Sequence, residues 1–120
     1  MRKVASVGVA LAALGLSGTA TAQKAEIGYP KGSLGFEAIM KSDLAAAERQ
    51  LRESALSKYD AGRALNLGYV LAKTGRTEQA SRQFVRVLRE DEVELILADD
   101  TSLSSHVAAR RALAALAKTR

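Results

Sequence analysis

Residues 63–94 place small side chains at fixed distances from large apolar ones, and this spacing restricts how the chain can fold. Gly68 has no Cβ atom and Ala80 has only a methyl group, so two helices can approach closely where these residues face each other. Large apolar side chains recur about one helical turn away and form a seam beside the small pair. The seam residues are Leu67, Leu71, Phe84 and Leu88. The pattern predicts two antiparallel helices in close contact.

Gly75 marks the expected break between these two helices. It follows Lys73 and Thr74, at a point where a helix must end and where glycine adopts a left-handed conformation with the least strain. We expect Thr77 to be the N-cap of the second helix, and Glu78 suits the positive end of that helix dipole.

The order and spacing of these residues resemble one tetratricopeptide repeat, a helix-turn-helix unit of about 34 residues. Three positions depart from the family pattern: Ala64 stands for Trp, Leu71 for Tyr and Glu92 for Pro. The resemblance implies a mainly α fold of antiparallel helical hairpins in an α-α superhelix. Repeats of this kind bind other chains and carry no chemistry of their own.

An earlier stretch is similar to the second half of a preceding repeat. Its residues lie 33 positions before their counterparts, as in 75 − 42 and 84 − 51. Ser42, Asp43, Leu44, Ala47, Leu51 and Ala55 correspond in this way to Gly75, Arg76, Thr77, Ala80, Phe84 and Leu88. Residues 34–40 could supply a short first helix. The tetratricopeptide-like region is therefore expected at residues 35–94, as one truncated and one full repeat.

Residues 1–22 have the three parts of a signal peptide. Arg2 and Lys3 give a charged start, residues 4–16 are an apolar run, and residues 20–22 read Ala-Thr-Ala before Gln23. A membrane-spanning helix is the alternative, but it needs about 20 apolar residues. We therefore expect cleavage before Gln23, export to the periplasm and no stable membrane insertion afterwards.

Cleavage would leave 98 residues (120 − 22), enough for one domain with a modest core. The chain has no cysteine, so helix packing rather than disulfide bonds must stabilise it. Residues 23–34 contain Gly28, Pro30 and Gly32 with little periodicity, and we expect a flexible lead there.

Residues 95–120 are expected to form a turn or hairpin followed by a capping helix. Val93, Leu95 and Leu97 alternate with other residues, which favours a strand, and residues 101–103 could return as its partner. A ragged helix end is the alternative. Ser104 or Ser105 can cap a last helix that covers the final apolar face. Its inward residues would be Ala109, Ala112, Leu113 and Leu116.

The sequence lacks the residues that catalysis or metal binding would need. His106 is the single histidine, and no glycine-rich phosphate loop precedes a helix. Residues 90–100 hold six carboxylates without the spacing of a calcium loop. We therefore expect no enzymatic activity, no cofactor and no metal.

Arginines could form a basic face along the second helix of the full repeat: Arg82, Arg86 and Arg89, with Arg76 just before them. They could meet an acidic partner; the alternative is a solvated face that pairs with Glu78 and Glu90. The charge without residues 1–22 would be +3, from 16 basic and 13 acidic residues, and nucleic-acid binders have denser patches. We do not expect a nucleic-acid partner.

The resemblance also implies a partner-binding surface, because the first helix of each hairpin lines the concave face in this family. The matching residues are Leu65, Tyr69, Ala72 and Lys73. Leu65, Tyr69 and Lys73 lie four residues apart and form one stripe that could hold a peptide, with Lys73 beside a carboxylate. In the alternative, the C-terminal segment fills this space and Leu65 and Tyr69 belong to the core.

Together these patterns predict a noncatalytic protein-protein interaction module that binds a peptide or protein partner in the periplasm or cell envelope. The alternative function is a structural protein that self-assembles, because a short repeat array leaves apolar ends that a homodimer could cover.

Overall fold

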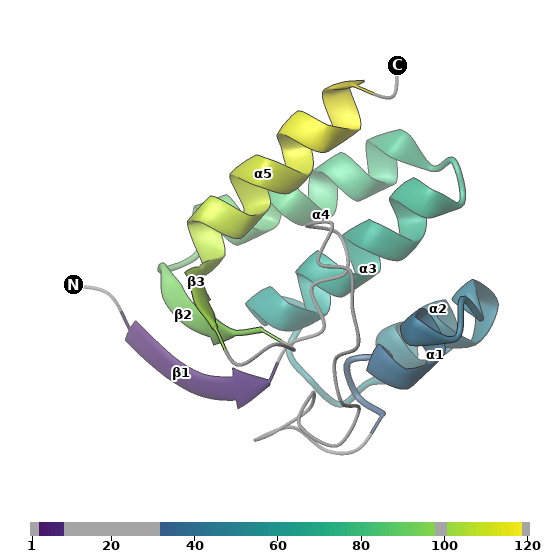
Figure 1. Cartoon of the computed structure of the whole chain (residues 1–120), viewed down its shortest axis with the longest axis horizontal. Helices are drawn as coiled ribbons and strands as arrows, with labels where there is room; N and C mark the ends of the chain where they lie inside the picture. The colour runs from purple at the N-terminus through teal and green to yellow at the C-terminus, as the bar shows by residue number, and fades with distance from the viewer. Residues whose placement is uncertain (1–2, 9–31, 98–100, 119–120) are drawn as a thin grey trace.

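The computed structural model describes residues 3–8, 32–97 and 101–118 (Figure 1), and for residues 3–8 it describes the backbone alone. These ranges form a mainly helical domain with five helices and three short strands. The helices are α1 (Phe36–Met40), α2 (Leu44–Glu53), α3 (Ala61–Lys73), α4 (Thr77–Arg89) and α5 (Ser105–Lys118). The strands are β1 (Lys3–Gly8), β2 (Val93–Ile96) and β3 (Ser102–Ser104). Within the described ranges, no helix combines the length and the apolar character needed to cross a bilayer.

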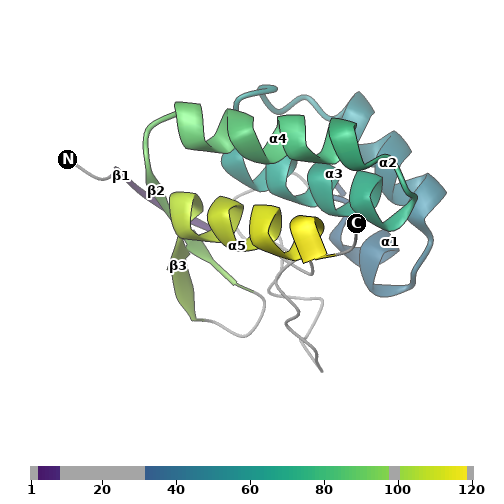
Figure 2. The same cartoon turned by 90° about the horizontal axis from the view of Figure 1, so that it is seen from above.

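Helix α3 lies at the centre of the helical part. It packs against α2, α4 and α5, while α5 also packs along α4 (Figure 2). The pairs α1–α2 and α3–α4 are consecutive helical hairpins, as the spacing of small and large residues predicted. Helix α5 closes the array by packing against the second hairpin.

The closest approach between α3 and α4 depends on Gly68. A Cβ atom built on this residue would lie 2.7 Å from Cζ of Phe84, whose side chain is fully buried. Gly35 occupies the same place in the first hairpin, since a Cβ there would lie 3.3 Å from Cγ of Leu51. Gly35 lies 33 residues before Gly68, and Leu51 lies 33 residues before Phe84. The same kind of contact therefore occurs once in each hairpin.

The turns inside the two hairpins also correspond. After α3, the amide of Gly75 donates to Ala72 O at 3.1 Å and that of Arg76 donates to Leu71 O at 2.9 Å. This is the Schellman arrangement, which needs a left-handed residue, and Gly75 has φ +82°. After α1, Ser42 takes the equivalent position with φ +59°. Its amide donates to Ile39 O, also at 2.9 Å.

One detail of the expected turn was wrong. Thr77 is not the N-cap of α4 but its first residue, and Arg76 holds the capping position without a side-chain capping bond. The reason is that the Schellman turn already ends at Arg76, so α4 begins one residue earlier than a Thr77 cap requires. The equivalent residue of the first hairpin, Asp43, does cap α2, because its Oδ1 accepts from Ala46 N.

The predicted hairpin and closing helix are confirmed. Strands β2 and β3 pair in antiparallel fashion, with Leu95 opposite Leu103, and Leu95 is buried. The side chain of Ser104 caps α5, because its Oγ accepts from His106 N at 3.1 Å. The buried face of α5 includes the predicted Ala109, Ala112 and Leu116 and adds Ala108, while Leu113 is partly buried.

Strand β1 completes the sheet in the order β1-β2-β3 and pairs with β2 in parallel. The register places Lys3 opposite Val93, Val4 opposite Glu94 and Gly8 opposite Ile96, with an irregularity between Val4 and Gly8. Of the predicted signal peptide, only residues 3–8 fall within the described part of the chain. They form a strand whose partner lies in the C-terminal half of the chain.

The start of the folded domain differs from the lead expected at residues 23–34. Leu34 is fully buried, and its carbonyl oxygen accepts from Asn66 Nδ2 at 3.0 Å. Leu34 precedes Leu67, another core residue, by 33 positions, so it is the first core residue of the first hairpin. Residues 23–31 lie outside the described part of the chain.

Replacing Gly68 by alanine is expected to lower the free energy of unfolding by about 1–3 kcal/mol, because the new methyl group overlaps the Phe84 ring. The better helix propensity of alanine acts in the opposite direction by at most about 1 kcal/mol. Urea unfolding followed by circular dichroism measures the net change. In a Phe84→Leu background the cost of Gly68→Ala should shrink, since the overlapping ring is gone. An equal cost in both backgrounds would contradict the contact.

Candidate protein-interaction surface

The structure separates the four residues of the predicted stripe. Leu65 is 1% exposed and lies in the core, because α3 is packed by α2, α4 and α5. Tyr69 and Ala72 are partly buried and pack against the edge of the core, whereas Lys73 is exposed. The accessible part of the stripe is therefore the last turn and a half of α3. We call Tyr69, Ala72 and Lys73 the Tyr69 patch.

Two side chains of the Tyr69 patch contact each other. Nζ of Lys73 lies 5.8 Å from the centroid of the Tyr69 ring, which is within the range of a cation–π contact. The ring is anchored because its inner side packs on the buried cluster. The patch thus presents a partly buried aromatic ring and a positive charge side by side.

The four arginines of the predicted basic face do not form one surface, because Arg76 forms an ion pair with a carboxylate of the same chain. Its guanidinium donates to both oxygens of Glu48, with Nη1–Oε2 at 2.9 Å and Nη2–Oε1 at 2.6 Å. Arg52 Nε donates to the same carboxylate at 2.8 Å. Glu48 belongs to α2, so this cluster joins the first hairpin to the turn of the second. Arg76 and Thr74 also share hydrogen bonds, which hold the guanidinium in place.

The cluster strongly favours the ionised form of Glu48. Hydrogen bonds from Arg76 and then from Arg52 lower the pKa of this carboxyl from 4.5 to about 2. The same bond to Glu48 raises the pKa of Arg76. Sequence spacing could not identify this pair, because its members are 28 residues apart and lie in different hairpins.

The other arginines make separate contacts. Arg82 lies 3.7 Å from Glu78 at an exposed position, as the solvated-face alternative expected. Arg86 Nη1 donates to Lys58 O at 3.5 Å, which ties α4 to the loop between α2 and α3. Arg89 is exposed. Arg63, which the sequence did not single out, donates to Leu51 O at 2.9 Å, and burial lowers its pKa.

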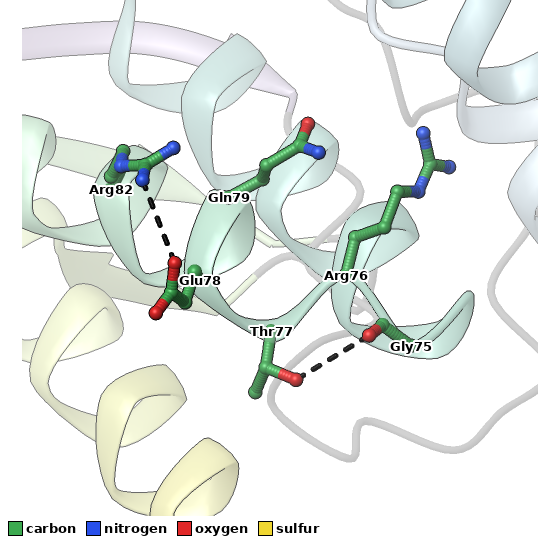
Figure 3. Close-up of a pocket in the computed structure, with 6 residues that line it drawn as sticks. All are labelled: Gly75, Arg76, Thr77, Glu78, Gln79 and Arg82. Atoms are coloured by element: carbon green, nitrogen blue, oxygen red, sulfur yellow. Dashed lines mark hydrogen bonds and ion pairs between the residues drawn. The ribbon is translucent and has the colours of Figure 1, made fainter.

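A shallow pocket of about 350 Å³ lies at the turn before α4. Figure 3 shows that Arg76 points away from Thr77 and Glu78, and that Glu78 reaches Arg82. Both arginines that line the pocket are therefore engaged with carboxylates of this chain. The pocket residues are Gly75, Arg76, Thr77, Glu78, Gln79 and Arg82.

His106 and the acidic stretch have structural roles where the structure describes them. Nε2 of His106 lies 2.7 Å from the carbonyl oxygen of Glu90 and links α5 to the end of α4. The hydroxyl of Ser104 donates to the carboxylate of Glu92. Glu92, for which the sequence comparison expected proline, thus joins the segment between α4 and β2 to the residue that caps α5. Among the described residues, no group of three or more His, Asp or Glu side chains could hold a metal ion.

Asn66 is a buried polar residue that sequence reasoning missed. It is 0% exposed, and its Nδ2 holds the Leu34 carbonyl, while its Oδ1 has no hydrogen-bond partner within the described ranges. Its position between Leu65 and Leu67 on α3 was the only sequence signal, since both neighbours are apolar. Asn66 fastens the start of the first hairpin to the centre of the second.

Comparison with known proteins finds no matching family model, no matching curated protein and no matching solved structure.

The pH dependence of stability should reflect Glu48. Because folding lowers its pKa from 4.5 to about 2, the cluster stabilises the native state above about pH 4.5, and this stabilisation is lost as the pH falls towards 2. Glu48→Gln should lower the free energy of unfolding at neutral pH by about 1 kcal/mol, a value reduced for solvent screening at this partly exposed pair.

The difference between wild type and Glu48→Gln should shrink on acidification, as measured by urea unfolding across this pH range. Glu53→Gln, at an exposed position on the same helix, serves as the control and should have little effect. A difference that stays constant from neutral to acidic pH would contradict the assignment.

Proposed function

We propose that this protein is a noncatalytic, exported interaction module with a tetratricopeptide-like arrangement of helical hairpins. The observation that carries the proposal is the correspondence of the two hairpins. Both use a glycine contact and a Schellman turn at positions 33 residues apart. Repeated hairpins of this kind commonly serve as rigid platforms for other chains.

The surface that we propose for binding is the Tyr69 patch. A partly exposed aromatic ring that is already ordered loses little conformational entropy on binding, which makes tyrosine effective at interfaces. Lys73 adds a positive charge at the edge of the ring. The preferred partner is therefore a peptide or protein segment in which an apolar side chain lies beside a carboxylate.

Because Leu65 lies in the core, the proposed binding surface is shorter than the predicted stripe. A long groove along α3 would need Leu65 at the surface, and its side chain is 1% exposed. Binding is proposed for the C-terminal end of α3 alone, so the interface should be small and the affinity modest.

Export can be tested directly. We expect the protein recovered from the periplasm to begin at Gln23, because residues 20–22 match a signal-peptidase site. Mass spectrometry of the intact protein reads the N-terminus. A protein that still begins at Met1 would contradict the export part of the proposal and leave the patch to be judged separately.

Binding can be tested by changing the patch. The double substitution Tyr69→Ala with Lys73→Glu should remove capture of an envelope partner by at least about tenfold, since the aromatic anchor is lost and the charge is reversed. In-cell crosslinking from a photoreactive residue at Ala72, followed by identification of the adduct, measures capture. Circular dichroism verifies that the variant remains folded.

The chain offers a matched control for this experiment. Lys58 lies over the ring of Tyr59, with Nζ 5.2 Å from the centroid, and Tyr59 is 51% exposed. Tyr59→Ala with Lys58→Glu changes the same residue types and the same charge at a different place. Equal loss of capture in both double variants would point to a general charge effect and would contradict the Tyr69 patch.

A further inference from the structure

Strand β2 has two paired edges, and its backbone groups divide between them. The amide of Leu97 donates to Thr101 O at 2.7 Å on the β3 side, and the amide of Val93 donates to Ser105 Oγ at 2.9 Å on the same side. Backbone groups point alternately to the two edges of a strand. The peptide groups of Glu94 and Ile96 are therefore directed to the opposite edge, where β1 lies (Figure 1).

Removal of residues 1–22 would take away all of β1. On that side of β2, β1 is the only strand of the sheet within the described ranges. An edge strand that loses its neighbour presents unpaired N–H and C=O groups, which are a template for another strand. Signal removal would thus convert β2 from a central strand into an edge strand.

We propose that in the exported protein this β2 edge binds an extended segment of another protein, which adds as a parallel strand in the place of β1. The proposal rests on the export part of the proposed function, and it assigns a second surface distinct from the Tyr69 patch. Main-chain hydrogen bonds to Glu94 and Ile96 provide the binding.

The sequence and the direction of β1 indicate what kind of segment can pair with the β2 edge. Residues 3–8 read Lys-Val-Ala-Ser-Val-Gly, so the segment that pairs with this edge is extended and contains no proline, which could not donate to the ladder. The direction also matters. A second copy that paired its β2 across a two-fold axis would run antiparallel, whereas β1 pairs in parallel. A strand from a different polypeptide is therefore the occupant that matches the observed pairing.

The probe for this site is a fluorescent peptide with the sequence of residues 2–9. We expect saturable binding, seen as a rise in fluorescence anisotropy, to the protein purified from the periplasm and shown by mass to begin at Gln23. Precursor in which Ala20→Leu and Ala22→Leu block cleavage should bind the peptide at least about tenfold more weakly. In that protein β1 is tethered beside the edge at millimolar effective concentration.

Two further measurements identify the mode of binding. A probe with Ala5→Pro should bind at least about tenfold more weakly, because Ala5 follows Val4, the residue opposite Glu94, and in a parallel ladder its amide would donate to the Glu94 carbonyl. Hydrogen exchange should show that the peptide protects the amides of Glu94 and Ile96, while those of Leu95 and Leu97 are already protected by β3. Binding should be unchanged by Tyr69→Ala with Lys73→Glu, because that patch lies elsewhere.

Each other outcome overturns the proposal. Absence of binding to protein that begins at Gln23 would show that the edge is not a docking site, and export would still stand. Equal binding of the Ala5→Pro probe would exclude strand addition. Protection of Glu94 and Ile96 without peptide, together with a dimer in sedimentation, would assign the edge to a second copy. A purified protein that keeps residues 1–22 would show that β1 stays in place.

Discussion

The contact between Gly68 and the Phe84 ring is the constraint on which the helical arrangement depends. Because a Cβ at Gly68 would lie 2.7 Å from Phe84 Cζ, the distance between α3 and α4 allows no larger residue there. That distance places α5 against both helices and leaves Leu65 inside the core. The same contact, with Leu51 against Gly35, sets the first hairpin. A close-packed pair at the centre therefore determines which part of α3 reaches the surface.

Polar contacts between the hairpins restrict how one hairpin can rotate against the other. The carboxylate of Glu48 accepts hydrogen bonds from Arg76 and Arg52. The side-chain amide of Asn66 donates to the carbonyl oxygen of Leu34. Apolar packing alone tolerates small rotations of one hairpin against the other, whereas a bidentate ion pair has one geometry. These links use residues that would otherwise be available to a partner. The two surfaces proposed for binding are small: the Tyr69 patch and, once β1 is removed, the edge of β2.

The two proposed surfaces have different physical origins. The Tyr69 patch consists of side chains on a helix, so it would select a partner by an apolar contact and a charge. The β2 edge consists of backbone groups, so it would select mainly for an extended conformation. Only the second depends on the proposed removal of residues 1–22, because β1 pairs with this edge in the structure.

The sequence by itself determined the local structure. Gly75, the alternation of Val93, Leu95 and Leu97, and the serine before α5 act through contacts within a few residues, so their spacing predicted the turn, the hairpin and the last helix. The predicted start of α4 was one residue too late, because the Schellman turn ends at Arg76 and Thr77 is already helical. Only the tertiary structure decided the use of Leu65, Arg76 and Asn66. Their burial or pairing depends on residues from other hairpins, at separations that no local pattern encodes.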